Sequence, residues 1–548
     1  MKFIDGYPEY MMDSIKVVEE KREENLIKKV KSLSPEARKD ILSKYHPDYM
    51  ADTKREVRIG VDKGSMMYNG IVDLIEARSI LDTGEVDLSR VDFDVDLLVV
   101  GGGGAGTVAA LFALEAGVEL DNILITTKLR HGDSNSMMAQ GGIQAADRPE
   151  DSPLLHYLDI YGGGHFTNKK ELALALAMDA PRIIDWHENL GVMYDRTEDG
   201  EFQELSGGGT CRNRMHSAKD YTGMELMRVI RDRTRNLDIP VLEFCPIVEL
   251  LMDENGAVSG GVAFNMETHE YYVVRAKATI LATGGSGRLH LSGYPTTNHY
   301  GATGDGLVMS YHAGANLRDL DTIQIHPTGD AFPDSVIGIL STEKIRGLGA
   351  APVNKLGEPF VFPLEPRDVE SAAFIKECKD GKGIVTPTGM PGVWLDTPMI
   401  DLKHGKGTTE AKLAGEVRRF RRFGIDMVKH PILVYPTLHY QNGGVEINEK
   451  CETQVPGLFA AGEVSGGVHG KNRLMGNSLL DYNVFGRRAG IQAAGYIKGR
   501  KVGKLTLSHI DRYNRAVDEL KIEGDRKAPI IVPEYRGKEA LARALDLL

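Results

Sequence analysis

The chain has 548 residues, and at about 150 residues per domain this length favours two to four domains. Its net charge of −12 argues against binding to nucleic acid, because that function needs a basic surface that displaces phosphate counterions. The four cysteines lie far apart without a CxxC pair, so we expect no metal or iron–sulfur cluster within this chain.

Residues 1–90 are charged and prone to form helices, and Ser34-Pro35-Glu36 has the cap-and-proline pattern of a helix start. We interpret this stretch as a helical extension that docks on the rest of the protein and takes no part in catalysis. The first residues lack the continuous apolar run of a signal peptide, and few cysteines suit a reducing compartment. A cytoplasmic location is therefore expected.

A strand followed by a glycine-rich turn opens the first domain. Residues 97–100 read as a buried strand, residues 101–106 are GGGGAG, and residues 107–116 read as a helix. This run fits GxGxxG, whose glycines let the backbone approach a pyrophosphate at the helix N-terminus. The uncharged stretch 97–114 is long enough to suggest a membrane helix, but its glycines favour the strand and turn. Membrane contact is expected only indirectly, through partner subunits.

The ends of two later strands bear on which dinucleotide is bound. NAD-binding domains usually place an acidic residue at the end of the second strand, whereas this chain has Thr126-Thr127-Lys128 there. The missing carboxylate weakens the case for NAD. The strand at 278–282 ends in the small residues Thr283 and Gly284, which could also approach a cofactor closely. Two such strand ends favour a large dinucleotide.

Strand-like runs alternate with helical patterns, such as that of residues 170–189, through most of the chain. The strand-like runs are at 123–125, 273–274, 279–282 and 457–461. Such alternation is typical of an α/β fold with a parallel sheet covered on both faces. Between residues 320 and 431, prolines and glycines break this rhythm, which indicates a second domain inserted into the first.

Seven short segments with distinctive sequences lie between Asp94 and Gly490. They are SNSMMAQGG at 134–142, QIHPTG at 324–329, STEKIRG at 341–347, EPRD at 365–368, PTLHY at 436–440, AGEVSGGVHGKNRL at 461–474 and GNSLLDYNVFG at 476–486. In this order they resemble the fumarate reductase/succinate dehydrogenase flavoprotein family, of which L-aspartate oxidase and adenylylsulfate reductase are also members. Seven ordered matches make chance convergence improbable.

The resemblance implies FAD as the cofactor and an α/β fold: an FAD-binding Rossmann-like domain with an inserted α+β capping domain and helical termini. We expect the extension at 1–90, the FAD-binding domain in two parts at 91–318 and 435–500, the capping domain at 319–434 and a short C-terminal helical segment at 501–548.

The resemblance and the two glycine-lined strand ends together give a set of expected cofactor-binding residues. They are Gly101, Gly103, Gly106, Thr127, Lys128, Asn135, Ser136, Gly141, Gly142, Thr283, Gly284, Asp305, Glu463, Asn477, Ser478 and Leu479. Asn135 stands where membrane-bound members carry a histidine that is covalently linked to the flavin. Because asparagine lacks a nucleophilic ring nitrogen, we expect non-covalent FAD.

The resemblance also implies hydride transfer between FAD and fumarate or succinate. It assigns the two carboxylates of this substrate to His326, Thr342, His439 and Arg473, whose donors suit carboxylate oxygens. It assigns proton donation to Arg367, with Glu343 and Arg346 as a relay toward solvent. A guanidinium has a pKa above about 12, so it can act as an acid only if it is reprotonated at once.

Two other functions stay open on the sequence. L-aspartate oxidase shares much of this site, and an FAD electron-relay subunit without dicarboxylate turnover would keep the cofactor loop alone. Because the chain offers no cluster ligands, an iron–sulfur protein subunit is the expected partner. The histidines His165, His216 and His290, and the cysteines Cys245 and Cys451, are interpreted as structural.

Overall fold

The computed structural model describes residues 2–522 and 526–533. Within these residues the largest sheet has eight strands. They are β6 (Phe93–Val100), β7 (Ile123–Thr126), β10 (Val241–Leu242), β11 (Ile247–Asp253), β12 (Val258–Phe264), β13 (Tyr271–Leu281), β21 (Leu458–Ala460) and β23 (Leu505–Thr506). Seven follow the order β10-β7-β6-β13-β12-β11-β23, and β21 pairs with β13.

The long strand β13 belongs to two parts of this sheet. Residues 271–275 pair antiparallel with β12, whereas residues 274–281 lie parallel to β6 and residues 279–281 lie parallel to β21. The two predicted runs at 273–274 and 279–282 are therefore one strand. The predicted runs at 97–100, 123–125 and 457–461 correspond to β6, β7 and β21, so the parallel sheet is confirmed.

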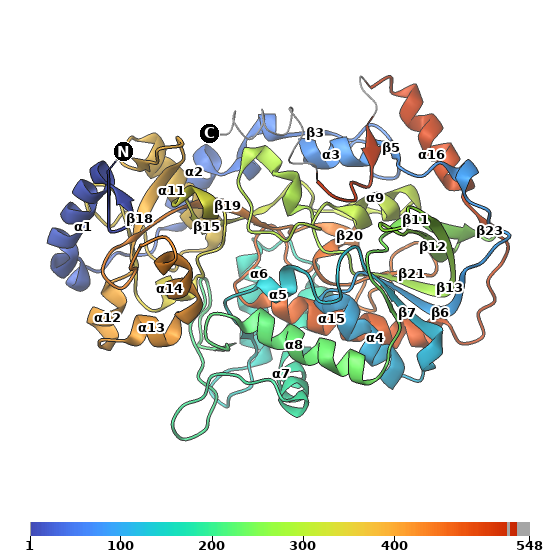
Figure 1. Cartoon of the computed structure of the whole chain (residues 1–548), viewed down its shortest axis with the longest axis horizontal. Helices are drawn as coiled ribbons and strands as arrows, with labels where there is room; N and C mark the ends of the chain where they lie inside the picture. The colour runs from blue at the N-terminus through green and yellow to red at the C-terminus, as the bar shows by residue number, and fades with distance from the viewer. Residues whose placement is uncertain (1, 523–525, 534–548) are drawn as a thin grey trace.

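Helices cover both faces of this sheet, as the α/β pattern predicts. On one side lie α4 (Gly104–Glu115), α6 (Pro153–Gly163), α7 (Lys170–Leu190), α8 (Thr222–Asn236) and α15 (Asn477–Tyr496), and on the other α3 (Asn69–Ile75), α9 (Asp305–His312) and α16 (Ser508–Glu519) (Figure 1). Glycines let α15 and α4 pack closely, because a Cβ on Gly490 would lie 2.2 Å from the carbonyl oxygen of Ala109.

A second, smaller lobe is inserted between β13 and β21. Its sheet is antiparallel, with the order β15-β19-β18-β16 and β17 paired to β18. The strands are β15 (Gln324–Asp330), β16 (Ala351–Val353), β17 (Ile384–Val385), β18 (Pro391–Asp396) and β19 (Ile432–Tyr440), and the helices are α10 (Lys344–Gly347), α11 (Arg367–Lys379), α12 (Met399–His404), α13 (Thr408–Lys412) and α14 (Ala414–Arg421). This is the inserted α+β unit that the sequence predicts.

Short paired strands complete the described structure. One small sheet has the order β14-β20-β22, formed by β14 (Leu317–Arg318), β20 (Gly444–Glu446) and β22 (Ser465–Gly466). The other pairs are β1 (Phe3–Ile4) with β2 (Tyr7–Pro8), β3 (Lys54–Glu56) with β4 (Met66–Tyr68), β5 (Arg78–Ser79) with β24 (Lys527–Ala528), and β8 (Ile143–Gln144) with β9 (Met215–His216). A short helix, α5 (Asn135–Met138), lies before β8.

The N-terminal segment runs across both lobes. Helix α1 (Glu9–Ile27) packs on the smaller lobe, where the Trp394 ring nitrogen donates to the Ser14 hydroxyl over 3.0 Å. Helix α2 (Pro35–Tyr45) packs on α11, and its predicted start is confirmed because the Ser34 hydroxyl accepts from the amide of Ala37. Helix α3 then joins the core of the large lobe.

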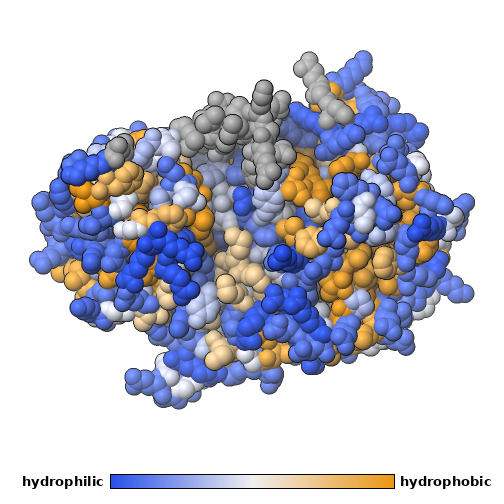
Figure 2. All heavy atoms as spheres, in the orientation of Figure 1, coloured by the Kyte–Doolittle hydropathy of each residue, from blue (hydrophilic) through white to orange (hydrophobic). Residues whose placement is uncertain are grey.

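The C-terminal segment contributes α16 and β24 to the large lobe, and residues 534–548 of the expected helical segment lie outside the described residues. None of the helices described is both long enough and apolar enough to cross a membrane. On the face shown in Figure 2, hydrophilic residues cover most of the smaller lobe, and hydrophobic residues show over larger areas of the large lobe.

Candidate functional site

A continuous cavity starts at the ends of the parallel strands β6, β7 and β13 and extends to the smaller lobe. Ligands of open α/β sheets bind at this edge, where the strands end. Among the sequence-predicted residues, the cavity is lined by Gly101, Gly103, Thr127, Lys128, Asn135, Ser136, Gly141, Gly142, Thr283, Gly284, Asp305, Glu463, Ser478, Leu479, His326, Thr342, Glu343, Arg367, His439 and Arg473. Gly106, Asn477 and Arg346 lie behind this lining.

At several positions of the glycine loop after β6, any side chain would clash with neighbouring atoms. A Cβ on Gly101, whose φ is +119°, would lie 2.2 Å from the carbonyl oxygen of Ala282. A Cβ on Gly104 would lie 2.7 Å from the ring of Tyr482. Gly103 caps α4, so the amide end of this helix opens into the cavity. Such an end favours a negatively charged group such as a pyrophosphate.

Gly106 serves a different purpose from Gly101 and Gly103. It lies inside α4, and a Cβ there would come 1.9 Å from the carbonyl oxygen of Gly101 and 3.0 Å from the Val99 side chain. The third glycine of the motif therefore allows α4 to pack against β6. It does not line the cavity itself, but it stabilises the loop that does.

Lys128 and Asp305 form one end of the cavity. The Lys128 ammonium lies 2.5 Å from the Asp305 carboxylate and donates to the Thr303 hydroxyl over 2.7 Å. Thr127 next to it is buried, and its side chain faces Gly102 of the glycine loop. The strand end that lacks the usual acidic residue thus receives a carboxylate from α9, which is far away in the sequence.

Asn135 is held on both sides of its amide. Its Nδ2 donates to Asn298 Oδ1 over 2.9 Å and to Glu463 Oε2 over 3.2 Å, while its Oδ1 accepts from the amide of His299. Glu463 is half-buried at the cavity wall, and its loss of water raises the pKa of its carboxyl. The Ser136 hydroxyl accepts from the amide of Gly104, so α5 is fixed to the glycine loop.

The N-terminus of α15 approaches the cavity from the other side. Gly476, with φ +79°, caps this helix, and Ser478 and Leu479 line the cavity. Asn477 is fully buried and turns away from the lining, with its Oδ1 lying 3.2 Å from His156 Nε2. Gly142 lies so close to β9 that a Cβ there would meet the carbonyl oxygen of His216 at 2.4 Å.

Two histidines from neighbouring strands meet where the cavity reaches the smaller lobe. His326 of β15 and His439 of β19 have ring centroids 5.0 Å apart. Burial lowers the pKa of both imidazoles well below the usual range, and Arg367 lowers it further, so both rings are neutral at pH 7. His439 Nδ1 lies 2.8 Å from the Thr297 hydroxyl, whereas His326 Nε2 has no hydrogen-bond partner among the described residues.

Arg473 brings a buried positive charge to the same place. Its guanidinium lies 4.4 Å from the centre of the Tyr440 ring, and its Nη1 donates to the carbonyl of Leu474. Nε and Nη2 are buried and, within the described part of the chain, have no hydrogen-bond partner. Burial and the neighbouring Arg367 lower the pKa of Arg473. An anionic ligand would satisfy these donors.

Arg367, Glu343 and Arg346 form a buried row at the edge of the cavity. Arg367 Nε donates to Glu343 Oε2 over 2.8 Å, and Arg346 Nη2 lies 3.5 Å from the same oxygen. Burial raises the pKa of the Glu343 carboxyl, but Arg367 and Arg346 outweigh this effect, and its pKa is lowered. Burial also lowers the pKa of Arg367. The spacing of three residues between Glu343 and Arg346 places both on one side of α10, as expected.

Two contacts of this row were not predicted from the sequence. Gln324 Oε1 accepts from Arg367 Nη1 over 2.9 Å, and Gln324 Nε2 donates to the carbonyl of Arg473 over 2.6 Å. The amide of Gly208 donates to Glu343 Oε1 over 2.7 Å. Gln324 is the first residue of the QIHPTG segment, so its position two residues before His326 could have identified it as a site residue. The GGG run at 207–209 gave no signal that distinguished it from an ordinary turn.

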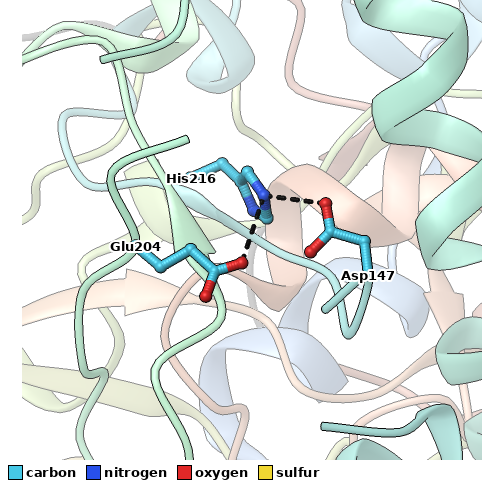
Figure 3. A group of neighbouring side chains, drawn as sticks. All are labelled: Asp147, Glu204 and His216. Carbon is cyan, nitrogen blue, oxygen red and sulfur yellow. Dashed lines mark ion pairs between the residues drawn. The ribbon is translucent and has the colours of Figure 1, made fainter. Parts of the chain in front are cut away.

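A separate group of acids surrounds His216 outside the cavity. His216 Nε2 lies 3.0 Å from Asp147 Oδ2 and 3.6 Å from Glu204 Oε1 (Figure 3). Their ligand atoms lie close enough together to surround a metal ion. Arg148, however, also pairs with Glu204 over 3.0 Å, so an arginine already engages one of the two carboxylates. Burial and Asp147 raise the pKa of Glu204 to about 7.

Comparison with known proteins places this site in a family. Residues 96–479 match the family described as FAD binding domain. The chain is 38% identical over 412 residues to one subunit of the fumarate reductase (CoM/CoB) of Methanothermobacter marburgensis, and the match covers 73% of each chain. It is 37% identical over 410 residues to L-aspartate oxidase of a Nostoc species, which covers 73% of this chain and 68% of that protein.

A solved structure shows the same similarity in three dimensions. A variant of the E. coli quinol fumarate reductase FrdA superposes with a TM-score of 0.70 at 33% identity, over 79% of this chain and 74% of that chain. The match of the FAD binding domain covers well over half of the chain. The chain therefore belongs to the fumarate reductase/succinate dehydrogenase flavoprotein family.

Proposed function

We propose that this chain is the flavoprotein subunit of a fumarate reductase or succinate dehydrogenase type enzyme, in which Arg367 exchanges a proton with the four-carbon diacid. The observation that carries the proposal is the uncompensated charge of Arg473 in the same cavity as the Arg367–Glu343 pair. A dianionic substrate supplies the carboxylate that Arg473 lacks.

The lining of the cavity fits FAD. Gly101 and Gly103 have no side chain that would keep a pyrophosphate away from the backbone. The α4 N-terminus complements the negative charge of the pyrophosphate. Thr283 Oγ1 is buried without a hydrogen-bond partner among the described residues, which suits a polar ligand at the end of β13. When bound, FAD supplies the hydride chemistry.

The residues of this chain bind the diacid and move the proton. Arg473 can grip one carboxylate with Nε and Nη2, and the neutral His326 can donate from Nε2 without adding charge. Arg367 Nη1 is fixed by Gln324 and its Nε by Glu343, so the guanidinium is aimed before substrate arrives. A preorganised donor of this kind lowers the cost of proton transfer.

Replacing Arg367 by Gln tests this role. The Arg367→Gln variant should retain FAD and lose nearly all fumarate reduction with a reduced dye as electron donor. Measured FAD content is the control for folding. Unchanged turnover would refute the assignment, and an inactive wild-type chain with bound FAD would instead favour an electron-relay subunit.

L-aspartate oxidase is the second candidate, because a relative of that name matches 73% of this chain. Aspartate carries an ammonium group that needs a carboxylate partner. At the end of the cavity near His326, the described lining residues offer only Glu343, which already holds Arg367. The charge of this end therefore favours a diacid without an amine. Parallel turnover assays with aspartate and succinate separate the two.

The side chain of Asn135 supports non-covalent FAD. Both ends of its amide are occupied by protein partners, and an amide nitrogen is a poor nucleophile. Acid precipitation should therefore release the flavin into the supernatant. Flavin that stays with the precipitated chain would contradict this proposal.

A partner protein is part of the proposal. The four cysteines of the chain are unpaired and lie far apart in the sequence, without the close spacing of a cluster-binding motif. Electrons must then reach the site from another chain, for which an iron–sulfur subunit is the expected candidate. The proposed location is cytoplasmic, with any membrane attachment made by partners. Purification from the native host would identify them.

A further inference from the structure

A second carboxylate lies behind the row of Arg367, Glu343 and Arg346. Arg346 is 2% exposed, and its Nη1 donates hydrogen bonds to Glu370 Oε2 and, over 2.6 Å, to the carbonyl of Pro363. Glu370 follows Arg367 by three residues on α11, so one helix positions both ends of the row. The order in space is Arg367, Glu343, Arg346 and Glu370.

Glu370 is suited to carry a proton. Its side chain is 0% exposed, and its Oε1 has no hydrogen-bond partner among the described residues. Burial raises the pKa of this carboxyl well above its usual range, with a further contribution from Glu343. A protonated Oε1 on Glu370 would leave Oε2 free to accept from Arg346.

The helix that carries Glu370 is covered by the N-terminal extension. Leu42 of α2 packs on Val369 and Ala372, which flank Glu370 on α11. Nearby, Glu365 accepts from the Ser32 hydroxyl over 2.7 Å and pairs with Arg38 over 2.8 Å. The Arg38 side chain is 35% exposed, so solvent reaches the protein at this junction.

We propose that Glu370 is the next member of the proton relay, which reprotonates Arg346 and is itself resupplied from the junction between α11 and the N-terminal extension. This inference rests on the proposed fumarate chemistry. In each turnover Arg367 gives one proton to substrate carbon. The Glu343 carboxylate then takes one proton from Arg346 and passes it to Arg367, and Arg346 regains a proton from Glu370. Solvent restores the proton of Glu370, so one proton enters for each one consumed.

The chemistry of arginine explains why a further acid is needed. A deprotonated guanidine has so high a proton affinity that Arg346 cannot remain neutral between turnovers. A buried carboxylic acid in direct contact supplies the proton faster than water that must first enter the protein. Without it, the first turnover can proceed from the protonated Arg367, but later turnovers must wait.

Comparison of single and repeated turnovers of the Glu370→Gln variant tests the proposal. Reoxidation of the prereduced enzyme by fumarate should proceed within about twofold of the wild-type rate, while steady-state kcat falls by roughly tenfold or more with KM little changed. The proposal fails if both rates fall together, since Glu370 would then only hold Arg346 in place, or if neither changes.

Glu377→Gln is the matched control. Glu377 lies on the same helix and is 5% exposed, but it accepts from Asn354 over 2.8 Å and is remote from the relay. Both of its rates should equal those of the wild type, and the Glu370→Gln pattern in this variant would overturn the proposal. If Glu370→Gln loses FAD, Glu370→Asp takes its place, with an intermediate kcat expected and the same contradicting results.

The two proposals fail in different ways. A wild-type chain that turns over neither fumarate nor succinate refutes the proposed function. A wild-type chain that is active and is inactivated by Arg367→Gln, but is unaffected by Glu370→Gln, refutes the extended relay alone.

Discussion

At the scale of single residues, the site depends on positions where no other side chain fits and on charges that are paired in a fixed order. Gly106 and Gly101 allow one backbone to pass against another, while Glu343 holds Arg367 and leaves Arg473 for a ligand. Even a small change of side chain at either kind of position should therefore have a large effect on FAD binding or on turnover.

Gly106→Ala should prevent stable FAD binding. The added Cβ would lie 1.9 Å from a backbone oxygen that cannot move without displacing the glycine loop, which costs about 3 kcal/mol or more. Gly495→Ala is the control, because Gly495 also lies in a helix and the added Cβ would have no atom within 4 Å apart from its chain neighbours and the nearby backbone of that helix. It should leave FAD binding unchanged and raise stability by about 0.5 kcal/mol. Retention of FAD by Gly106→Ala would contradict the packing argument.

The pair of His165 and Asp368 should make the stability of the folded protein depend on pH. Its atoms lie 2.7 Å apart, and the contact raises the pKa of His165; burial alone would raise the pKa of Asp368, but His165 lowers it. The raised His165 pKa contributes stability that is complete below about 6.5 and is lost as pH rises through the folded value. Because His165 is partly exposed, the effect is about 1 kcal/mol or less.

Urea unfolding of the wild type and His165→Gln over this pH range measures that contribution. The difference in unfolding free energy between them should shrink as pH rises above about 6.5. The Asp368 contribution has the opposite sign, since its lowered pKa gives stability that is lost as pH falls. A difference that does not change with pH would show that the pair contributes no linked protonation.

At the scale of elements, helix α1 is part of the core of the smaller lobe although the sequence shows it only as a charged extension. Ile15 and Val18 are fully buried in the same cluster as Trp394, and Arg22 pairs with Asp396 over 2.9 Å. The extension therefore stabilises the lobe that carries Arg367.

Ile15→Ala should destabilise the smaller lobe by about 2–5 kcal/mol, because it leaves a cavity in a packed core. Lys16→Ala, one position further along α1, changes a side chain that is 63% exposed and should shift stability by less than about 0.5 kcal/mol. Thermal unfolding of both variants makes the comparison. Equal midpoints would mean that α1 is dispensable to this lobe.

At the scale of the whole molecule, the two lobes are held together by polar contacts around the cavity. Lys344 Nζ donates to the carbonyl of Lys219 over 2.7 Å, and Lys412 Nζ donates to Gln203 Oε1 over 2.6 Å. The cavity itself is lined by residues of both lobes, between Val100 and Tyr482. A ligand that fills it can bind only the assembled fold.

Removal of FAD should therefore lower the unfolding midpoint of the whole protein, and adding FAD back should raise it with concentration. At a free concentration of one hundred times Kd, the gain is about 2.7 kcal/mol. Thermal scans of the apoprotein at increasing FAD measure this. A midpoint independent of FAD would mean that the cofactor does not bind this cavity in the folded chain.

The sequence by itself determined the features that depend on local order. The strand, glycine turn and helix at 97–116 follow from periodicity and from backbone freedom at glycine, and the ordered segments identified the family and the inserted lobe. Most of the predicted cavity residues could be named because they lie inside one of those segments, and others, such as Thr127 and Thr283, because they follow a predicted strand.

Only the tertiary structure decided which distant groups meet. Three contacts join segments that no spacing rule connects. They are those of Glu370 with Arg346, of Gln324 with Arg367, and of Ser32 in the extension with Glu365. The physical reason is that the proton affinity of a buried group depends on its neighbours in space and on its loss of water, and packing sets both. The same packing turned a charged N-terminal stretch into the outer wall of the proposed proton relay.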